Sequence, residues 1–468
     1  MHGYQAADFE CVDFSVAFTD AIDRNLAQHL AKGRFQEDLT FAYWHPSRGA
    51  SRYTAILHRL ALPDADGDRL LQGNVAFTAG YLERVLSQRP ADCGVALLHS
   101  HLGPGWQAMS EDDVIAERDR LAGLVASTAN LPLVGLTWGT DGTWSARFWL
   151  RRGRHQYERQ WASTVRAVGR RLRVSYQPEL RPAPPSPQSQ AATISVWGES
   201  TQQDLARTRV GVVGLGSVGS IVAEALSRTG VQHVALIDHD LIEVRNLDRT
   251  LGAYPEDAEC KISKVLVSKR LVDRSHTAAS FMAEPVIDSL LGGDGLAHAL
   301  DCDLLISCVD RPWPRHALNT IAYAHLIPVV DGGILARVSE GGKLVHVDWR
   351  IHTVGPDRAC LYCIDALRRS DVALDRDGTL DDPEYIKGLS AAERERYGRR
   401  NVFAFSLSVA AHQVLHAVAL VAGNERVGGT GPQTYHAYPG TMEVSARQEC
   451  GAECDVAPLT ATACSVLG

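Results

Sequence analysis

The chain has 468 residues, which is too long for a single hydrophobic core and predicts at least two domains. Its hydrophobic content of 45% and charged content of 22% are typical of globular proteins, and a net charge of -8 gives the whole chain no electrostatic footprint for nucleic acid. The sequence contains neither an uninterrupted apolar run long enough to span a bilayer nor a secretory signal at its N-terminus. We therefore expect a cytoplasmic protein that binds neither nucleic acid nor membrane.

The first part of the chain, residues 1–176, predicts a mixed α/β domain. Short apolar runs typical of strands, such as LTFAYW, GVALLHSH and LPLVGLTW, alternate with helical stretches such as YLERVLSQ and SEDDVIAERDRLAGLVAST. The alternation is irregular, and it contains no internal repeat.

One of these apolar runs ends in two histidines on alternate positions, His99 and His101, and a loop then leads to Ser110 and Asp113 at the start of the next helical stretch. Alternate side chains of a strand point to the same side, so both imidazoles can reach one ion, and a carboxylate from the next helix can complete three protein ligands. The fourth position of such a zinc site stays open for water. An isolated HxH pair is usually structural, but the correctly spaced SxxD favours a metal site.

The pattern HxH-x8-SxxD resembles the JAMM/MPN+ (JAB) metalloprotease family over about residues 30–150. The resemblance implies that His99, His101 and Asp113 hold a catalytic zinc ion and that Ser110 helps to stabilise an oxyanion. It also implies a glutamate that removes a proton from water. Glu37 is the best match, and Glu83 is the alternative. The expected substrate is a peptide or isopeptide bond that follows a flexible tail.

A proline-rich segment, residues 177–194, separates this domain from the rest of the chain. Such a composition favours an extended, semi-rigid spacer and cannot build a core. The second domain is then expected over residues 195–468. Within it, residues 370–400 are highly charged without an apolar stripe, which predicts a long connection.

The second domain begins with a strand, a glycine-rich turn and a helix. The turn is GLGSVG, with Gly214, Gly216 and Gly219 in the order GxGxxG, and Asp238 ends the following strand. Glycines let backbone N–H groups approach phosphates at a helix N-terminus, while a carboxylate can accept hydrogen bonds from ribose. By itself this motif indicates a nucleotide.

The next residues distinguish a triphosphate from a nicotinamide cofactor. Asp240, Asn246, Arg249 and Lys264 supply a carboxylate, an amide and two cations suited to ribose and triphosphate. Asp310 follows the strand LLISCV at a sheet edge, where a magnesium ligand would be useful.

Together with DxxxxR at Asp310 and Arg315 and with IPVVDGG, these motifs resemble the ThiF/MoeB/E1 superfamily of ubiquitin-like-protein activating enzymes over residues 195–468. The resemblance implies a Rossmann-like domain with a mostly parallel sheet and an ATP-dependent adenylation of a C-terminal carboxylate. It places Asp238 and Asp240 at the ribose and Asp310 at magnesium. It places Asn246 and the catalytic cations Arg249 and Lys264 at the phosphates.

Four cysteines have the spacing of metal ligands: Cys360 and Cys363 in CxxC, and Cys450 and Cys454 in CxxxC. Four thiolates suit a tetrahedral structural zinc ion that joins distant segments, and many members of the superfamily carry such a site. Free cysteines are the alternative.

Two features depart from the superfamily pattern. Residues 364–449 contain no cysteine, so a thioester in the usual place is not expected, and Cys260 and Cys464 remain as candidate nucleophiles by elimination. Cys302 and Cys308 lie in or beside an apolar strand and are assigned to the core. The arginine that family members often carry just before the adenylation motif is also absent from SVWGESTQQDL.

These motifs lead to one hypothesis: a bifunctional enzyme of a bacterial ubiquitin-like pathway that adenylates a β-grasp protein and cleaves bonds made to it. The resemblance implies an E2-like partner and a homodimer formed through the adenylation domain. Activation of a sulfur-carrier protein for thiamine, molybdopterin or cysteine synthesis is the nearest alternative. A regulatory binding module with one inactive half is a further alternative, and an NAD-dependent oxidoreductase is a third.

Overall fold

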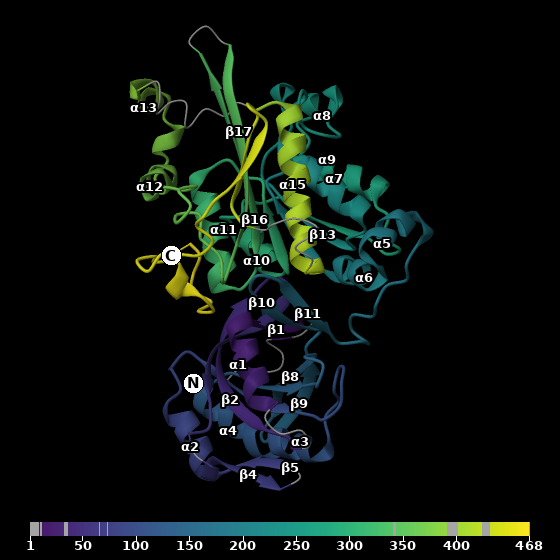
Figure 1. Cartoon of the computed structure of the whole chain (residues 1–468), viewed down its shortest axis with the longest axis vertical. Coiled ribbons are helices and arrows are strands. Elements are labelled where there is room, and N and C mark those ends of the chain that lie inside the picture. Colours follow the sequence, from purple (N-terminus) through teal and green to yellow (C-terminus); the bar gives the residue numbers. More distant parts are fainter. Residues whose placement is uncertain are drawn as a thin grey trace. The chain divides into compact units, whose positions relative to one another are not determined.

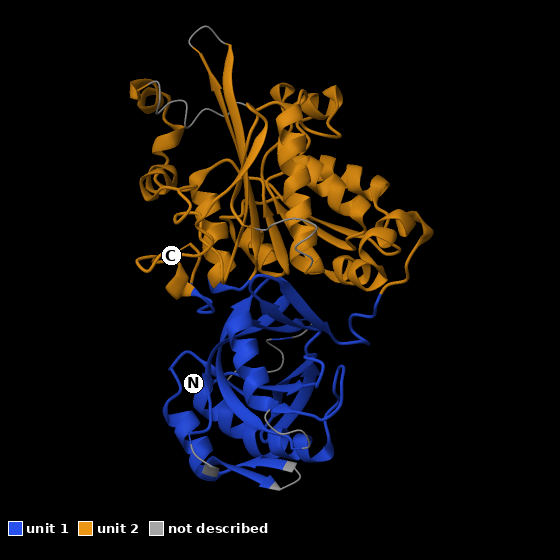
Figure 2. Cartoon of the chain, in the orientation of Figure 1, with its two compact units in different colours: residues 1–183, 324–326, 460–464 blue, residues 184–323, 327–459, 465–468 orange. Residues whose placement is uncertain are grey.

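The structure is a computed structural model that describes the chain except for residues 1–8, 10, 11, 32–35, 65, 73, 340–342, 391–400, 424–430 and 468. The chain divides into two compact units (Figure 2). Unit 1 comprises residues 1–183, 324–326 and 460–464, and unit 2 comprises residues 184–323, 327–459 and 465–468. The division at 183/184 lies inside the predicted proline-rich linker.

Unit 1 is built on a nine-stranded mixed sheet with the order β11-β10-β1-β3-β2-β6-β7-β8-β9, and a separate β4-β5 hairpin accompanies it (Figure 1). Its elements are β1 (Asp13–Thr19), α1 (Asp20–Leu30), β2 (Leu39–Arg48), β3 (Arg52–Ala61), η2 (Asp66–Asp68), β4 (Arg69–Gln72), β5 (Asn74–Phe77), α2 (Ala79–Ser87), β6 (Gly94–Ser100), α3 (Glu111–Val114), the π-helix η3 (Ile115–Leu121), α4 (Ala122–Ala129), β7 (Leu133–Trp138), β8 (Trp144–Gly153), β9 (Gln156–Trp161), β10 (Thr164–Val168) and β11 (Leu172–Tyr176).

The central strands of unit 1 are buried on both faces, which explains their continuous apolar sequence. Along β2, Ala42 and Trp44 belong to one hydrophobic cluster, whereas Phe41 and Tyr43 belong to another. Because successive side chains of a strand alternate between faces, the two clusters cover opposite sides of the sheet. The strand β6 between β2 and β7 is completely buried, and this rigid position holds the two histidines at its end.

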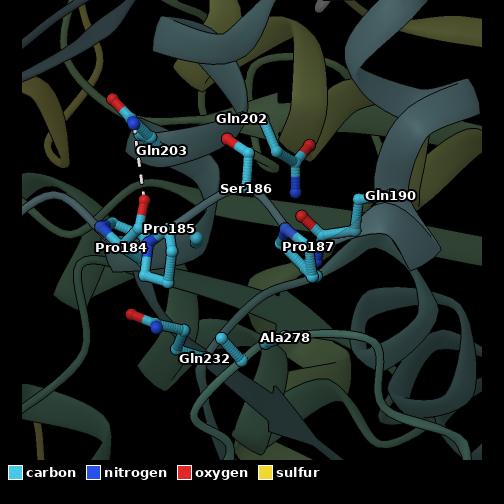
Figure 3. Close-up of a pocket in the computed structure, with 12 residues that line it drawn as sticks. Pro184, Pro185, Ser186, Pro187, Gln190, Gln202, Gln203, Gln232 and Ala278 are labelled. Atoms are coloured by element: carbon cyan, nitrogen blue, oxygen red, sulfur yellow. Dashed lines mark hydrogen bonds between the residues drawn. The ribbon is translucent and has the colours of Figure 1, made fainter.

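The proline-rich segment is shorter than the sequence predicts. Residues 188–194 are not extended, because η4 (Gln188–Gln190) and α5 (Ala191–Trp197) occupy them. Residues 184–187 belong to unit 2 (Figure 3), where Gln203 donates a hydrogen bond of 3.4 Å to the Pro184 carbonyl. The pocket between the prolines and nearby glutamines has a volume of about 10 Å³, which is at the lower limit for one water molecule. The glutamines therefore anchor the chain and leave no room for a ligand.

Unit 2 contains an eight-stranded sheet with the order β14-β13-β12-β15-β16-β17-β18-β19. Its further elements are α6 (Glu199–Arg207), β12 (Arg209–Val213), α7 (Ser217–Thr229), β13 (His233–Ile237), η5 (Val244–Asn246), α8 (Pro255–Glu259), α9 (Lys264–Ser275), β14 (Met282–Val286), α10 (Gly293–Leu300), β15 (Leu304–Ser307), α11 (Pro312–Ala324), β16 (Val329–Val338), β17 (Leu344–Val354), α12 (Arg369–Arg376), η6 (Thr379–Asp381), α13 (Pro383–Gly388), α15 (Phe403–Ala422), β18 (Gln433–His436), β19 (Thr441–Val444) and η7 (Ala457–Leu459).

The sheet of unit 2 has a parallel and an antiparallel part. Strands β14, β13, β12, β15 and β16 are parallel, as expected of a Rossmann-like domain, and β17, β18 and β19 continue the sheet with antiparallel pairing. The prediction of a mostly parallel sheet thus holds for the nucleotide half only. From β12 the chain proceeds to β13 on one side and later to β15 on the other. In open α/β sheets this reversal creates a crevice at the carboxyl ends of the strands.

The long helix α15 packs on the sheet beside α7 (Figure 1). It is the one helix in the described part of the chain that is long and apolar enough to cross a membrane by length and composition. Its most apolar window is 56% buried inside the protein. Buried apolar residues such as Val409, Val414 and Ala417 pack against the domain, which explains the low polarity of the helix.

The predicted long connection at residues 370–400 is also wrong in its first part. Short helices α12, η6 and α13 occupy residues 369–388, and residues 391–400 lie outside the described residues. Arg311 at the start of α11 anchors this segment, because its guanidinium pairs with both Asp375 and Asp381. The charges that suggested a solvated connection are thus used in local ion pairs.

Candidate functional site

A cleft of about 1380 Å³ lies in unit 2 at the carboxyl ends of the parallel strands. Loops after β12, β13, β14 and β15 line it, together with residues 332–335 of β16, α11 and the α12–α13 segment. The structure brings the predicted nucleotide-binding residues to this one cleft, with the exception of Gly219. Those that line it are Gly214, Gly216, Asp238, Asp240, Asn246, Arg249, Lys264 and Asp310.

The three glycines of the GxGxxG motif differ in what a side chain at each position would meet. Gly214 has a φ of +88°, and a Cβ there would lie 2.8 Å from the Cys308 carbonyl oxygen. At Gly219 a Cβ would lie 1.8 Å from the Gly214 carbonyl oxygen, so this glycine lets α7 pack on the turn. At Gly216 an added Cβ would have no neighbouring atom within 4 Å. Its missing side chain is therefore not required by packing, and it leaves the N-terminus of α7 accessible to a ligand.

Asp238 links the glycine-rich turn to the end of β13. Its carboxylate accepts hydrogen bonds from the backbone N–H groups of Leu215 (2.5 Å) and Asp240 (2.8 Å). Burial raises the pKa of Asp238, while nearby Lys264 and these N–H donors act in the opposite direction. The carboxylate thus shapes the turn, and its remaining lone pairs face the cleft.

Asp240 and Lys264 form an ion pair of 2.7 Å at the rim of the cleft. The Lys264 side chain is only 11% exposed, whereas that of Asp240 is 53% exposed. Ser263 caps α9, and the Lys264 backbone N–H donates to the Asp240 carbonyl at 3.0 Å. These contacts hold the Lys264 backbone beside Asp240, and the ammonium group of Lys264 is thereby kept at the cleft.

The two other predicted phosphate ligands lie on the η5 turn and just after it. The Asn246 side-chain oxygen accepts from the Glu243 N–H at 2.9 Å, which leaves its amide NH2 available. Arg249 pairs with the exposed Asp248 at 2.7 Å. An exposed partner is readily exchanged for a phosphate, because surface ion pairs contribute little.

A charge network at the cleft adds Arg350 to Asp331 and Arg315, which belong to the sequence motifs IPVVDGG and DxxxxR. The fully buried Asp331 accepts from Arg315 at 2.6 Å and from Arg350 at 3.0 Å, and Ser307 donates to it at 3.0 Å. Burial would raise the pKa of Asp331, but the two guanidinium groups outweigh burial and lower it. Two guanidinium groups thus face Asp331 at the cleft wall, and the negative charge of Asp310 also acts on Arg315. The buried Nε of Arg350 also has no hydrogen-bond partner among the described residues.

In unit 1, His99, His101 and Asp113 form the compact cluster that the HxH-x8-SxxD pattern predicts. The Nε2 atoms of the two histidines are 3.2 Å apart, and each lies 3.2 Å from a carboxylate oxygen of Asp113. Ligands 2.0–2.1 Å from a tetrahedral zinc ion are about 3.3 Å from one another. The donor set and its spacing therefore fit zinc.

The carboxylate of Asp113 is held by a helix cap. Ser110 is the N-cap of α3, its hydroxyl accepts from the Asp113 N–H at 3.2 Å, and its own N–H donates to Asp113 at 2.7 Å. The SxxD spacing is thus also a capping box. Burial would raise the pKa of Asp113, but hydrogen bonds from His101 and His99 hold it far below its usual value.

Glu37 joins this cluster through strand pairing. Leu39 on β2 lies opposite His99 on β6, so continuation of the antiparallel register brings Glu37 toward His101. Burial raises the pKa of Glu37, while the charges of His101 and His99 lower it and that of Asp113 raises it. The alternative residue, Glu83, is exposed on α2.

The four predicted zinc cysteines also lie together. The thiols of Cys360, Cys363, Cys450 and Cys454 offer ligand atoms within 4.8 Å of one another, and the sulfur atoms of Cys360 and Cys454 are 3.6 Å apart. This separation is close to the value of about 3.8 Å expected between thiolates on a tetrahedral zinc ion. The unusual CxxxC spacing does not prevent the cluster from forming.

The remaining cysteines differ in accessibility. Cys260 is exposed and Cys464 is half-buried. Cys302 is buried, as expected, while Cys308 is half-buried with its pKa strongly raised by burial. A raised pKa suppresses the thiolate, so Cys308 is a poor nucleophile.

Comparison with known proteins identifies relatives of unit 2. Residues 188–458 match the ThiF family. The adenylyltransferase and sulfurtransferase UBA4 of Yarrowia lipolytica is 28% identical over 179 residues, which cover 36% of this chain and 40% of that protein. The tRNA threonylcarbamoyladenosine dehydratase of Escherichia coli is 29% identical over 143 residues, covering 30% of this chain and 52% of that protein.

The ubiquitin-like modifier-activating enzyme 5 of Aedes aegypti is 25% identical over 187 residues, covering 38% of this chain and 45% of that protein. The chain thus spans about half of the length of these relatives, or less. Among solved structures, that of E. coli MccB with succinimide aligns with a TM-score of 0.44 and 14% identity over 58% of this chain and 74% of that one.

Proposed function

Because the chain belongs to the ThiF family, we propose that the cleft of unit 2 binds ATP and adenylates the C-terminal carboxylate of a ubiquitin-like β-grasp protein. The observation that carries this proposal is the gathering of eight predicted nucleotide-binding residues on one cleft. They come from loops at the carboxyl ends of the strands where the strand order reverses, which is the usual place for a nucleotide in such a sheet.

In the proposed reaction, a carboxylate oxygen of the substrate attacks the α-phosphorus of ATP. The bond between the α-phosphorus and the bridging oxygen breaks, pyrophosphate leaves and an acyl-adenylate remains. The open N-terminus of α7 at Gly216 receives phosphate oxygens, and Asp238 and Asp240 accept from ribose. Lys264 and Arg249 offset the charge that shifts to pyrophosphate.

The substrate carboxylate is itself an anion, so it needs a cation in the cleft. Arg350 and Arg315 both line the cleft, and their guanidinium groups face Asp331, so they supply the cations nearest to this wall of the cleft. These arginines can thus fulfil the role of the arginine that is absent before the adenylation motif. Asp310 offers a hard oxygen ligand in the cleft, and magnesium, when bound there, would offset phosphate charge.

We propose that an E2-like protein or another acceptor in the cytoplasm takes the acyl group directly from the adenylate. No cysteine of residues 364–449 takes part, because that range contains none. A sulfur-carrier substrate is the alternative, since two relatives are named adenylyltransferase and sulfurtransferase. Both versions share the adenylation step and differ in the acceptor that consumes the adenylate.

ATP–pyrophosphate exchange tests the adenylation proposal. The full chain, magnesium and a purified β-grasp protein with a Gly-rich C-terminal tail should catalyse exchange. The same protein lacking its last residues should not, because the carboxylate would no longer reach the α-phosphorus. Exchange in neither case would refute adenylation of this substrate class.

We further propose that unit 1 is a JAMM-type metallopeptidase that cleaves peptide or isopeptide bonds to the same β-grasp protein. The supporting observation is the approach of His99, His101, Asp113 and Glu37. A zinc ion held by the first three would supply a Lewis acid for the scissile carbonyl. Glu37 accepts a proton from the attacking water, and the Ser110 hydroxyl, whose hydrogen is free of the cap, donates to the developing oxyanion.

A fluorogenic peptide fused to the β-grasp tail tests this second activity. Cleavage should require zinc and should be lost in Asp113→Ala with the zinc content reduced by one ion per chain. Cleavage by the zinc-depleted Asp113→Ala protein at the wild-type rate would refute the proposal.

We also propose that Cys360, Cys363, Cys450 and Cys454 bind a structural zinc ion. This ion would tie the segment after β17 to the segment after β19, which are distant in sequence. The four thiols alone are enough to complete a tetrahedral coordination shell, so no other side chain is required. Cys363→Ser should lower the zinc content by one ion and lower the melting temperature of unit 2, and an unchanged zinc content would count against the site.

A further inference from the structure

A second group of metal-binding side chains lies on the antiparallel part of the sheet in unit 2, away from the cysteines. His346 and Asp348 are alternate residues of β17, so they share one face of the sheet. Asp348 lies directly opposite His436 on β18. Glu443 on β19 lies opposite Thr434, which places it diagonally beside His436 on the same face. Figure 1 shows β17 next to the yellow C-terminal strands.

The polar atoms of this group converge on the Asp348 carboxylate. Nε2 of His346 is 2.7 Å from one carboxylate oxygen, and Nδ1 of His436 is 2.9 Å from the other. One ligand atom from each of the three residues fits within 4.8 Å of the others. Their side chains are 19–33% exposed, so the group is open to solvent on one side and supported by strands on the other.

The remaining nitrogen of His436 has a carboxylate partner. Nε2 of His436 is 3.2 Å from Glu443, while Nδ1 faces Asp348. A histidine that binds a metal through one nitrogen commonly donates the N–H of the other to a carboxylate, which fixes the ring and its tautomer. A simple ion pair with Asp348 would require only a charged His436. It would not require a second histidine, His346, on the same carboxylate.

We propose that His346, Asp348 and His436 bind one divalent transition-metal ion of the zinc class, and that Glu443 orients His436. Two imidazoles and one carboxylate suit zinc and similar first-row ions, whereas magnesium prefers oxygen donors. Three protein ligands leave one coordination position open. The site uses no residue of the adenylation or peptidase proposals, so it stands independently of both.

The position of the site relates it to the cleft within unit 2. Along the same face of β17, the residue after Asp348 is Arg350, which lines the cleft. Leu335 on β16, directly opposite Asp348, also lines it. A metal ion here would therefore lie at the margin of the cleft, where its open position can accept a carboxylate, imidazole or thiolate from a bound partner.

Zinc content of the full-length protein tests the site, because the other proposed zinc sites are unchanged in each variant. After dialysis against zinc and removal of free ion, His436→Ala and His346→Ala should each hold one zinc ion per chain fewer than the wild type. Glu443→Gln should keep the ion at saturation but bind it about 10–100-fold more weakly. His276→Ala removes an exposed histidine that stacks on Phe281 and serves as the matched control.

Equal zinc contents in the wild type, His436→Ala and His346→Ala, with unchanged circular dichroism, would overturn the proposal and leave an ion pair network only. If His436→Ala fails to fold, His346→Ala decides, because its side chain lies at the outer end of β17. Loss of zinc from His276→Ala as well would show that the loss is not specific and would also overturn the assignment.

Discussion

The His99–His101–Asp113 cluster and the cleft of unit 2 are assembled in different ways. The cluster uses the end of one buried strand and the cap of the next helix, so short stretches of chain place all three ligands. The cleft draws its lining from Val213 to Val409. A locally built site can be recognised from spacing alone, whereas a cleft built from many loops contains residues that no short motif includes.

The two regions also differ in how they are supported. Behind the cluster, the buried pair of Glu117 and Arg147 connects the π-helix η3 to β8, and Arg147 also donates to Thr137, which contacts His99 at 3.3 Å. In the cleft, the corresponding support is the Arg315–Asp331–Arg350 network, which faces the ligand directly. One cation faces one carboxylate behind the cluster, whereas two guanidinium groups face Asp331 at the wall of the cleft, where an anion would bind.

The largest effect is expected at the proton acceptor of unit 1. Glu37→Gln should lower peptide cleavage by about 10²–10⁴-fold with zinc content unchanged, because the amide cannot accept the proton. Zinc analysis beside the fluorogenic assay measures both quantities. Glu83→Gln is the matched control and should cleave normally. Unchanged cleavage by Glu37→Gln would assign the role to another residue.

A separable loss is expected in unit 2. Lys264→Ala removes a cation that offsets charge on the departing pyrophosphate, and Asp310→Ala removes the proposed magnesium ligand, so each should reduce ATP–pyrophosphate exchange by about 10²–10³-fold. Peptide cleavage should stay at the wild-type rate. Lys269→Ala removes another lysine of α9, which pairs with Asp273, and is the control. Simultaneous loss of both activities would contradict two independent sites.

A moderate effect is expected at the cation that the sequence analysis missed. Arg350→Lys keeps the charge but loses the guanidinium fork, so the KM for the β-grasp protein should rise about 10–100-fold while the KM for ATP changes little. Exchange rates at varied concentrations of each substrate separate the two constants. A larger rise in the KM for ATP would move Arg350 from the carboxylate to the phosphates.

The smallest effect distinguishes two glycines of the same motif. Gly216→Ala should leave the melting temperature unchanged and weaken ATP binding by about tenfold, because its Cβ enters open space at the helix N-terminus. Gly219→Ala should instead lower the melting temperature, since its Cβ would overlap the Gly214 carbonyl oxygen. Calorimetric melts and ATP titration measure both. Equal melting temperatures for the two variants would refute this distinction.

The sequence by itself determined the features that depend on local spacing. The HxH pair lies at the end of one strand, with His99 in it and His101 directly after it. SxxD spans one helical turn, and GxGxxG joins one strand to one helix, so each motif is complete within a short stretch of chain. The same holds for the order of strands and helices that predicts a Rossmann-like domain. At residues 369–388 the absence of an apolar stripe predicted a connection without helices. That prediction was wrong because ion pairs with Arg311 stabilise the short helices there.

Tertiary structure decided which distant residues meet. Strand register brings Glu37 toward His101, burial pairs Asp331 with two arginines, and two antiparallel strands gather His346, Asp348 and His436. None of these contacts has a fixed spacing along the chain, because register and loop length vary independently of the residues they bring together. The sequence determines which chemical groups are present, and the pairing of strands in the sheets determines which of these groups meet.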